Sequence, residues 1–205
     1  MPTSAALRQT PISASFSDGK TITRKPISWK DFQRRFLRRE DGFKYEWVDE
    51  GVVKSVRTMD KTQLFILENL LEFFDRLKSA GQADGRLISE PDLFFLENHR
   101  RPDVAWLTRE QIYRLADKDA YEVPAFVVEV ISTNDQIILV EKKMDNYRDA
   151  GVKVVWQIYP SLRKVNVYSG ERLSQMIVCK GDAICSAAAA IPDFQMAASS
   201  VFKLQ

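Results

Sequence analysis

Two acidic residues in or beside apolar segments constrain the fold of this chain more than any other feature. Asp103 stands directly before the apolar segment 104–107, and Glu129 lies within the apolar segment 126–131. Short apolar segments of this kind predict buried strands. Because an unpaired buried charge is costly, we expect a positive partner for these carboxylates, and a divalent metal ion would serve both.

The length and composition predict one domain preceded by an N-terminal arm. A chain of 205 residues with 45% hydrophobic residues is long enough to bury a sizeable core. Residues 1–26 are rich in Ser, Thr and Pro, so we expect a flexible arm there and a single domain over residues 27–205. The formal net charge of +2 gives no whole-chain argument for nucleic-acid binding, so any basic surface must be local.

Several classes of protein are excluded by what the sequence lacks. Two cysteines, Cys179 and Cys185, and one histidine, His99, form neither a zinc-site pattern nor a disulfide framework. His99 falls in a polar segment where we expect a surface turn, so a Ser-His-Asp hydrolase would depend on this one residue. No apolar run approaches the roughly 20 residues of a membrane span, and no secretory signal is visible. We therefore expect a soluble, cytoplasmic protein without membrane association.

The order of the predicted elements indicates an α/β fold. Apolar periodicity predicts the longest helices over residues 60–79 and 135–150. Strands are predicted over residues 43–48, 52–56, 86–96, 103–107, 125–131, 154–159, 164–168 and 173–178. The strand–helix–strand succession over residues 125–159 is typical of a βαβ unit. We expect a central mixed sheet flanked by helices on both faces.

Two further charged residues lie in predicted regular elements, and the sequence leaves two interpretations of each open. Glu46 lies in the strand 43–48, where an outward-facing side chain is favoured on composition and a carboxylate near a metal is the alternative. Lys143 lies on the helix 135–150 at the edge of its apolar stripe, whereas Lys142 points away from that stripe. Lys143 can either extend along the core edge or reach a site on the sheet.

The acidic pair and the lysine fit one kind of chemistry if the fold brings them together. The carboxylates of Asp103 and Glu129 and the carbonyl of Val130 are the hard oxygen ligands that Mg²⁺ prefers. Such a metal polarises a scissile phosphate and lowers the pKa of its bound water. Lys143 would orient that water or stabilise charge developing on the phosphate. Each residue alone also has a structural explanation, such as an arginine partner for Glu129.

A helix that begins at Ser28 carries the densest group of basic residues. Its arginines are Arg34, Arg35, Arg38 and Arg39. A solvated helix face is the favoured interpretation of this group, and a face that contacts phosphates is the alternative. The candidate nucleic-acid-binding residues are Arg34, Arg35, Arg38, Arg100 and Arg101.

Several short runs occur in an order that resembles a known family. They are Tyr45-Glu46-Trp47-Val48-Asp49, Arg101-Pro102-Asp103-Val104, Val127-Val128-Glu129-Val130-Ile131-Ser132, Lys143-x-x-x-Tyr147, Ala150-Gly151-Val152, Trp156 and Tyr159-Pro160. In this combination the sequence resembles the Uma2 family of restriction-endonuclease-like proteins, also called DUF820, from Trp29 to the C-terminus. Each short run alone is a weak signal, whereas their combination is specific.

The resemblance implies a restriction-endonuclease-like core of the PD-(D/E)XK nuclease superfamily. It implies Mg²⁺-dependent cleavage of phosphodiester bonds in DNA, with Mn²⁺ as a substitute, and a homodimer that cuts both strands. Asp103 and Glu129 would be the acidic ligands. The superfamily lysine would fall at Ile131, and Lys143 on the following helix matches the place that takes over its role. Glu46 matches a family glutamate and would flank the metal.

Four positions depart from the family pattern and keep other hypotheses open. They are Glu50, Gln63, Thr133 and Leu139, where a glycine, a histidine, a proline and an acidic residue are usual. A catalytically impaired nuclease-fold protein that binds nucleic acid or a protein partner is therefore the second hypothesis. A structural protein whose N-terminal arm recruits partners is the third. Metal binding separates the third hypothesis from the others, and cleavage separates the first from the second.

Overall fold

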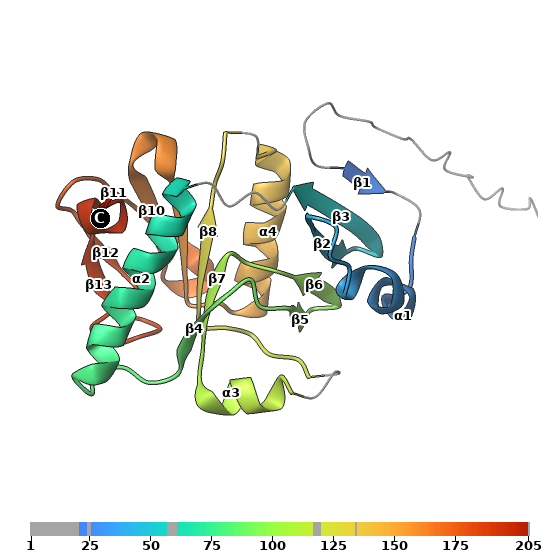
Figure 1. The fold of residues 1–205 in the computed structure, drawn as a ribbon, viewed down its shortest axis with the longest axis horizontal. Coiled ribbons are helices and arrows are strands. Elements are labelled where there is room, and N and C mark those ends of the chain that lie inside the picture. The colour runs from blue at the N-terminus through green and yellow to red at the C-terminus, as the bar shows by residue number, and fades with distance from the viewer. Residues whose placement is uncertain (1–20, 24–25, 57–60, 117–119, 134, 205) are drawn as a thin grey trace, which may run out of the picture.

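The computed structural model describes residues 21–23, 26–56, 61–116, 120–133 and 135–204. Its helices are α1 (Trp29–Phe32), α2 (Lys61–Ser79), α3 (Arg109–Arg114), α4 (Ile137–Ala150) and α5 (Ala198–Val201), with short π or 3₁₀ turns η1 (Gln33–Leu37), η2 (Pro160–Leu162) and η3 (Glu171–Leu173). The expected α/β class with a mixed sheet is confirmed (Figure 1). The arm predicted over residues 1–26 lies outside the described residues, apart from residues 21–23 and Pro26.

The large sheet forms the centre of the molecule. Its strand order is β11-β10-β9-β8-β7-β4. The strands are β4 (Arg86–Ser89), β7 (Val104–Leu107), β8 (Phe126–Val130), β9 (Val154–Tyr159), β10 (Lys164–Ser169) and β11 (Gln175–Cys179). β8 and β9 are parallel, and the other neighbours are antiparallel. Because a parallel pair needs a crossover, α4 connects β8 to β9, which confirms the predicted βαβ unit.

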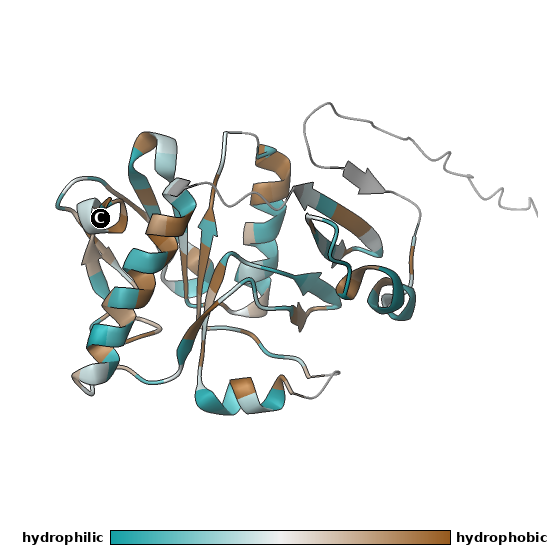
Figure 2. Cartoon of the chain, in the orientation of Figure 1, coloured by the Kyte–Doolittle hydropathy of each residue, from teal (hydrophilic) through white to brown (hydrophobic). Residues whose placement is uncertain are grey.

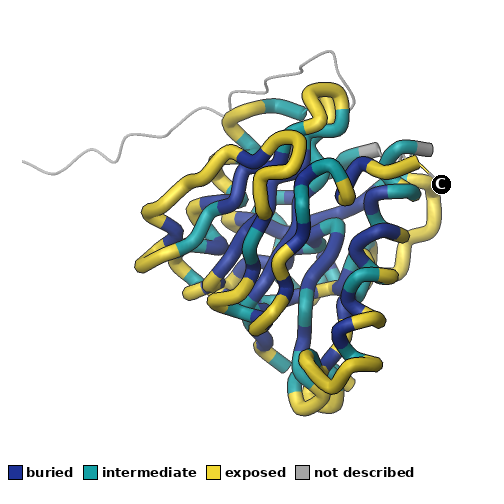
Figure 3. Tube along the Cα trace, turned by 90° about the vertical axis from the view of Figure 1, so that its left-hand side faces the viewer, coloured by how far each residue is buried: buried dark blue, intermediate teal, exposed yellow. Residues whose placement is uncertain are grey.

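Each face of the large sheet has its own apolar core. Val128 packs in one core with Phe74 of α2 and with the C-terminal segment, which includes the small sheet of β12 (Ile184–Ser186) and β13 (Gln195–Ala197). Val127, on the opposite face, packs with Met144 of α4. A strand covered on both faces is apolar at successive positions, and Glu129 is the exception in β8. Figure 3 shows these buried strands in the middle of the molecule, with exposed turns around them.

A smaller antiparallel sheet lies beside the large one (Figure 1). Its order is β1-β3-β2-β6-β5, with β1 (Thr21–Thr23), β2 (Phe43–Val48), β3 (Gly51–Val56), β5 (Leu93–Phe95) and β6 (Asn98–Arg100). One of its faces packs on α1 through an aromatic cluster that includes Phe32, Tyr45 and Trp47. Ser28 Oγ accepts a hydrogen bond from the Asp31 backbone N–H at 3.2 Å, so the predicted helix start is confirmed.

Helix α2 buries most of the apolar stripe that its spacing predicts. The predicted stripe is Leu64, Leu67, Leu71, Phe74 and Leu77. Phe74 and Leu77 are buried and Leu67 and Leu71 are partly buried against the core, whereas Leu64 is 51% exposed. Ile66 and Leu70, which lie outside the predicted stripe, are also buried. Figure 2 shows apolar and polar residues alternating along this helix. Because apolar side chains occur on more than one side of α2, spacing alone does not decide which row faces the sheet.

Helices and strands end close to where proline, glycine and capping residues predict, with two differences. Pro91 separates β4 from β5, which belong to different sheets and not to one interrupted strand. Gly151 ends α4 with φ of 85°, a left-handed conformation that glycine adopts at low cost. The sequence predicts Asn134 or Asp135 as the N-cap of α4. The observed N-cap is Gln136, while Asp135 Oδ2 accepts a hydrogen bond of 2.6 Å from Ser132 N; Asn134 lies outside the described residues. Among the helices that the structure describes, none has the length and apolar character to cross a membrane.

Candidate active site

The two acidic residues from the large sheet face each other across neighbouring strands. β7 and β8 are antiparallel with Val104 opposite Val128, so the next pair along is Asp103 and Glu129. Opposed residues point to the same face of a sheet. Both line a cavity of about 690 Å³ between the two sheets. Asp103 Oδ2 accepts a hydrogen bond of 2.7 Å from the backbone N–H of Val130, which fixes its carboxylate at the end of β8.

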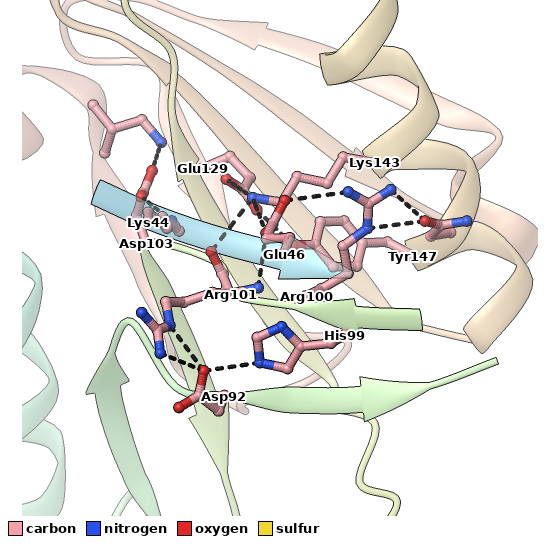
Figure 4. A network of polar contacts seen from close by, with 12 residues as sticks. Lys44, Glu46, Asp92, His99, Arg100, Arg101, Asp103, Glu129, Lys143 and Tyr147 are labelled. Carbon is pink, nitrogen blue, oxygen red and sulfur yellow. Dashed lines mark hydrogen bonds and ion pairs between the residues drawn. The ribbon is translucent and has the colours of Figure 1, made fainter. Parts of the chain in front are cut away.

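Helix α4 brings Lys143 to the centre of this cluster (Figure 4). Lys143 Nζ lies 2.8 Å from Glu129 Oε1 and 3.2 Å from Glu46 Oε1. Tyr147, one helical turn later, donates its hydroxyl proton to Glu129. The interpretation of Lys143 as a residue that reaches the sheet is therefore the correct one. The exposed Lys142 pairs instead with Asp49.

Glu46 is buried, so the outward-facing interpretation that its composition favoured is wrong. It is 7% exposed and lies between the two sheets. Arg100 Nη1 donates to Glu46 Oε2 at 3.2 Å, and the Arg101 backbone N–H donates to Glu46 Oε1 at 2.8 Å. Lys143 contacts both Glu46 from the small sheet and Glu129 from the large sheet, so it links the carboxylates of the two sheets.

Lys44 is a member of the cluster that the sequence reasoning missed. Lys44 Nζ lies 3.0 Å from Asp103 Oδ1. Lys44 and Glu46 are two residues apart on β2, so both point toward the cavity, while Tyr45 and Trp47 point into the aromatic cluster. This alternation of charged and aromatic residues in β2 is the sequence signal from which Lys44 could have been placed in the cluster.

The five arginines proposed to bind nucleic acid do not form one surface. Arg34 and Arg35 on η1 and Arg38 at its C-cap are exposed. Arg100 is 3% exposed and is bonded to Glu46 and Asn146, and Arg101 pairs with Asp92 at 2.6 Å. The inclusion of Arg100 in a surface cluster was wrong, because a buried carboxylate holds its guanidinium inside the protein.

His99 is not a surface turn residue, contrary to expectation. It lies in β6 and is 2% exposed. Its Nε2 lies 2.8 Å from Asp92 Oδ1, and Asp92 also binds Arg101. The polar segment forms a strand because β6 pairs with both β2 and β5, which supplies backbone partners that the isolated segment lacks. Asp92 and Arg101 therefore connect His99 to the edge of the acidic cluster (Figure 4).

Burial and charge shift the acidity of the cluster in opposite directions. Burial raises the pKa of Glu46, but the nearby charges of Lys143 and Arg100 outweigh it and hold that pKa well below its usual range. Burial also opposes ionisation of Asp103, and the charges of Lys44 and Lys143 still lower its pKa. For Glu129, burial dominates and raises the pKa despite Lys143. Burial lowers the pKa of Lys143, but its carboxylate neighbours raise it above the ordinary value. The carboxylates thus hold Lys143 in its charged form.

The donor atoms at the cavity fit a hard divalent cation. In the described part of the chain, no group of three or more His, Cys, Asp or Glu side chains is placed to hold a metal. A metal here would rest on the carboxylates of Asp103 and Glu129, the carbonyl of Val130 and water. Mg²⁺ is commonly bound through one or two carboxylates while it keeps several waters. The residues present therefore fit Mg²⁺ better than a metal that needs several histidines or thiolates.

Comparisons with known proteins agree with this arrangement. The sequence model of the family described as "Uma2: Putative restriction endonuclease" matches residues 29–199. A solved structure described as "a putative nuclease belonging to DUF820 from Anabaena variabilis ATCC 29413" is similar with a TM-score of 0.70 and 17% identity, over 86% of this chain and 98% of that chain. At that identity the likeness concerns the fold. No curated protein matches the sequence.

Proposed function

Because the chain belongs to the Uma2 family, we propose that it is a Mg²⁺-dependent endonuclease that hydrolyses phosphodiester bonds of DNA. One observation carries this proposal. Asp103 and Glu129 face each other on adjacent strands in a cavity, with Lys143 2.8 Å from Glu129. Two carboxylates from neighbouring strands and a lysine from α4 beside them are groups that can serve metal-assisted phosphate hydrolysis.

Asp103, Glu129 and the Val130 carbonyl would hold the metal. When bound, Mg²⁺ would polarise the phosphate and make its water more acidic; Mn²⁺ would substitute for it. The cavity of about 690 Å³ has room for a phosphodiester beside these residues. A cytoplasmic homodimer would place two such sites on a duplex.

Lys143 would position the reacting groups in this cavity. Its charged form is favoured by Glu129 and Glu46, so it donates hydrogen bonds but does not act as a base. The ammonium would hold the attacking water or a phosphate oxygen, where developing negative charge strengthens the interaction. Glu46 would keep Lys143 in place, because its own position is fixed by Arg100 and by the Arg101 backbone.

Nicking of supercoiled plasmid with Mg²⁺ or Mn²⁺ tests the proposal. We expect cleavage that EDTA abolishes and that Asp103→Ala, Glu129→Ala and Lys143→Ala each reduce by about 100-fold or more. Lys142→Ala is the matched control, because Lys142 lies next to Lys143 but pairs with Asp49 outside the cluster. Cleavage that survives Asp103→Ala would assign the activity to another site or to a contaminant.

A non-cutting binder is the alternative, and one observation favours it. Each carboxylate of the cluster already contacts a lysine: Asp103 contacts Lys44, and Glu46 and Glu129 contact Lys143. Such pairs balance the buried carboxylate charges without a metal, and removing one partner would leave a buried charge uncompensated. Absence of cleavage by clean protein on plasmid, single-stranded DNA and RNA, together with retained nucleic-acid binding, would support this alternative.

A further inference from the structure

Lys44 is the residue of the cluster to which the proposed reaction assigns no role. The cluster holds three carboxylates (Glu46, Asp103 and Glu129) and three cationic side chains (Lys44, Lys143 and Arg100). Lys44 pairs with Asp103, while Lys143 and Arg100 pair with the two glutamates. Its formal charges therefore balance without any metal. A divalent cation that entered would compete with a cation already present, so one of the three must give way.

The contacts identify the cation that is held least firmly. Lys143 contacts two carboxylates, and its Nζ also lies 3.5 Å from the Arg101 carbonyl. Arg100 contacts Glu46 and is bonded to Asn146 through two nitrogens. Within the described residues, the ammonium of Lys44 contacts only Asp103. Breaking this single ion pair therefore disturbs the cluster least.

The Asp103 side is also the open side of the cluster. The Asp103 side chain is 33% exposed, whereas those of Glu46 and Glu129 are each 9% exposed. Figure 4 shows the Lys44–Asp103 pair at one end, with Lys143 between the two glutamates. A hydrated cation in the cavity can thus reach Asp103 before the other carboxylates.

A displaced Lys44 would stay in the same cavity. Its side chain lines the cavity, and its backbone belongs to β2, two residues before Glu46. Lysine is a flexible point charge that binds phosphates well. A phosphodiester beside a metal on Asp103 would lie within the space that the ammonium can sweep.

We propose that Lys44 occupies Asp103 until a divalent metal displaces it, and that the freed ammonium then binds a phosphate oxygen of the substrate. The exchange keeps Asp103 paired in the resting protein and makes a phosphate ligand available only when the metal is present. It rests on the proposed function, because it requires Asp103 as a metal ligand.

Mn²⁺ binding to the whole protein, measured by the loss of the free-ion EPR signal, tests the exchange. We expect Lys44→Met to bind Mn²⁺ about tenfold more tightly than the wild type, because a competing charge is removed. Lys54→Met is the matched control, since it also removes one lysine. Lys54 is opposite Tyr45 and lies over the Phe43 ring, on the face of the small sheet away from the cavity. We expect its Mn²⁺ affinity to stay within about twofold of the wild type.

A second measurement tests the phosphate contact. In Ca²⁺, which also binds oxygen ligands, fluorescence anisotropy reports the affinity for an oligonucleotide duplex. We expect Lys44→Met to weaken this binding by about fivefold, and Lys44→Arg to retain it, because arginine also binds phosphate. Equal losses of duplex affinity in Lys44→Met and Lys54→Met would overturn the proposed contact between Lys44 and a phosphate. Thermal melting of each variant, and the further variant Lys44→Gln, separate a loss of affinity from a folding defect.

Asp103→Asn distinguishes failure of this inference from failure of the proposed function. Mn²⁺ binding that Asp103→Asn leaves unchanged would remove the metal site of the proposed function, and the exchange with it. Binding that depends on Asp103 but is equal or weaker in Lys44→Met would overturn the exchange alone. Tighter binding in Lys44→Met that Asp103→Asn abolishes would support both.

Discussion

The two sheets of this protein use their buried faces in different ways. The large sheet has an apolar core on each face, and its buried polar side chains are Glu129, Gln157 and Asn166. The small sheet has one aromatic face and one charged face, and its buried polar residues are Lys44, Glu46, Asn98, His99 and Arg100. Stability is therefore concentrated in the large sheet, while the small sheet supplies charged side chains that face the carboxylates of the large sheet.

This difference explains where the candidate site lies. Asp103 directly precedes β7 and Glu129 lies in β8, which are interior strands of the large sheet. Among the described residues, neither carboxylate has a basic partner on a strand of that sheet. Their cationic partners are Lys44 from the small sheet and Lys143 from α4. The site exists only because the two sheets and α4 meet, so its charges should respond to mutations differently from the core.

Removal of a core side chain from the large sheet should have the largest effect on stability. Trp156 is fully buried and its ring lies 5.3 Å from Phe126 and 5.6 Å from Phe194. We expect Trp156→Ala to lower the free energy of unfolding by about 3–5 kcal/mol, measured by urea denaturation. The exposed Tyr113 is the control, and Tyr113→Ala should change stability by less than about 0.5 kcal/mol. A loss below about 1 kcal/mol for Trp156→Ala would contradict the concentration of stability in this sheet.

Replacement of Lys143, whose ammonium contacts two carboxylates, should have the second-largest effect on stability. Lys143→Met leaves Glu46 and Glu129 buried without the ammonium between them. We expect a loss of about 3 kcal/mol at pH 7, with a partial recovery at lower pH as Glu129, whose pKa is raised by burial, takes up a proton. Lys142→Met, which breaks an exposed pair, should cost less than about 1 kcal/mol. Equal losses would mean that the buried cluster contributes no more than the surface pair.

The stability that Glu46 contributes should depend on pH, unlike the stability that apolar core residues contribute. Its pKa in the folded protein is lowered by Lys143 and Arg100 against the effect of burial. A lowered pKa contributes stability that is present above the unfolded value, near 4.5, and is lost as pH falls toward the folded value. We expect Glu46→Gln to be about 2 kcal/mol less stable than the wild type at pH 7, and the two proteins to converge toward pH 2. Parallel stability curves from pH 7 to pH 2 would show that this carboxylate has an ordinary pKa.

Loss of the Tyr147 hydroxyl, which removes a hydrogen bond but no charge, should have the smallest effect on stability. Tyr147 donates its hydroxyl proton to Glu129. Tyr147→Phe should cost about 1–2 kcal/mol, and it should reduce plasmid nicking less than Glu129→Gln does. Tyr121→Phe, at a 64% exposed position, is the control. A larger loss of activity in Tyr147→Phe than in Glu129→Gln would give the hydroxyl a direct role.

Local sequence patterns were enough to predict much of the fold. The β8–α4–β9 unit, the glycine that ends α4 and the cap at Ser28 follow from periodicity and from backbone preferences within a few residues. Glu129 interrupts an apolar segment, and the sequence alone is enough to show this.

The tertiary structure decided which charges meet. Lys44 and Arg100 belong to the cluster, His99 is buried, and Leu64 is exposed. Each of these facts depends on how β2 and β6 pair and on how the small sheet and α2 lie against the large sheet. The energy of a charge depends on its neighbours in space and on its exclusion from water. Residues as far apart as Lys44 and Asp103 become neighbours only through strand register and sheet packing, whereas helices, caps and buried strands are encoded within a few residues of chain.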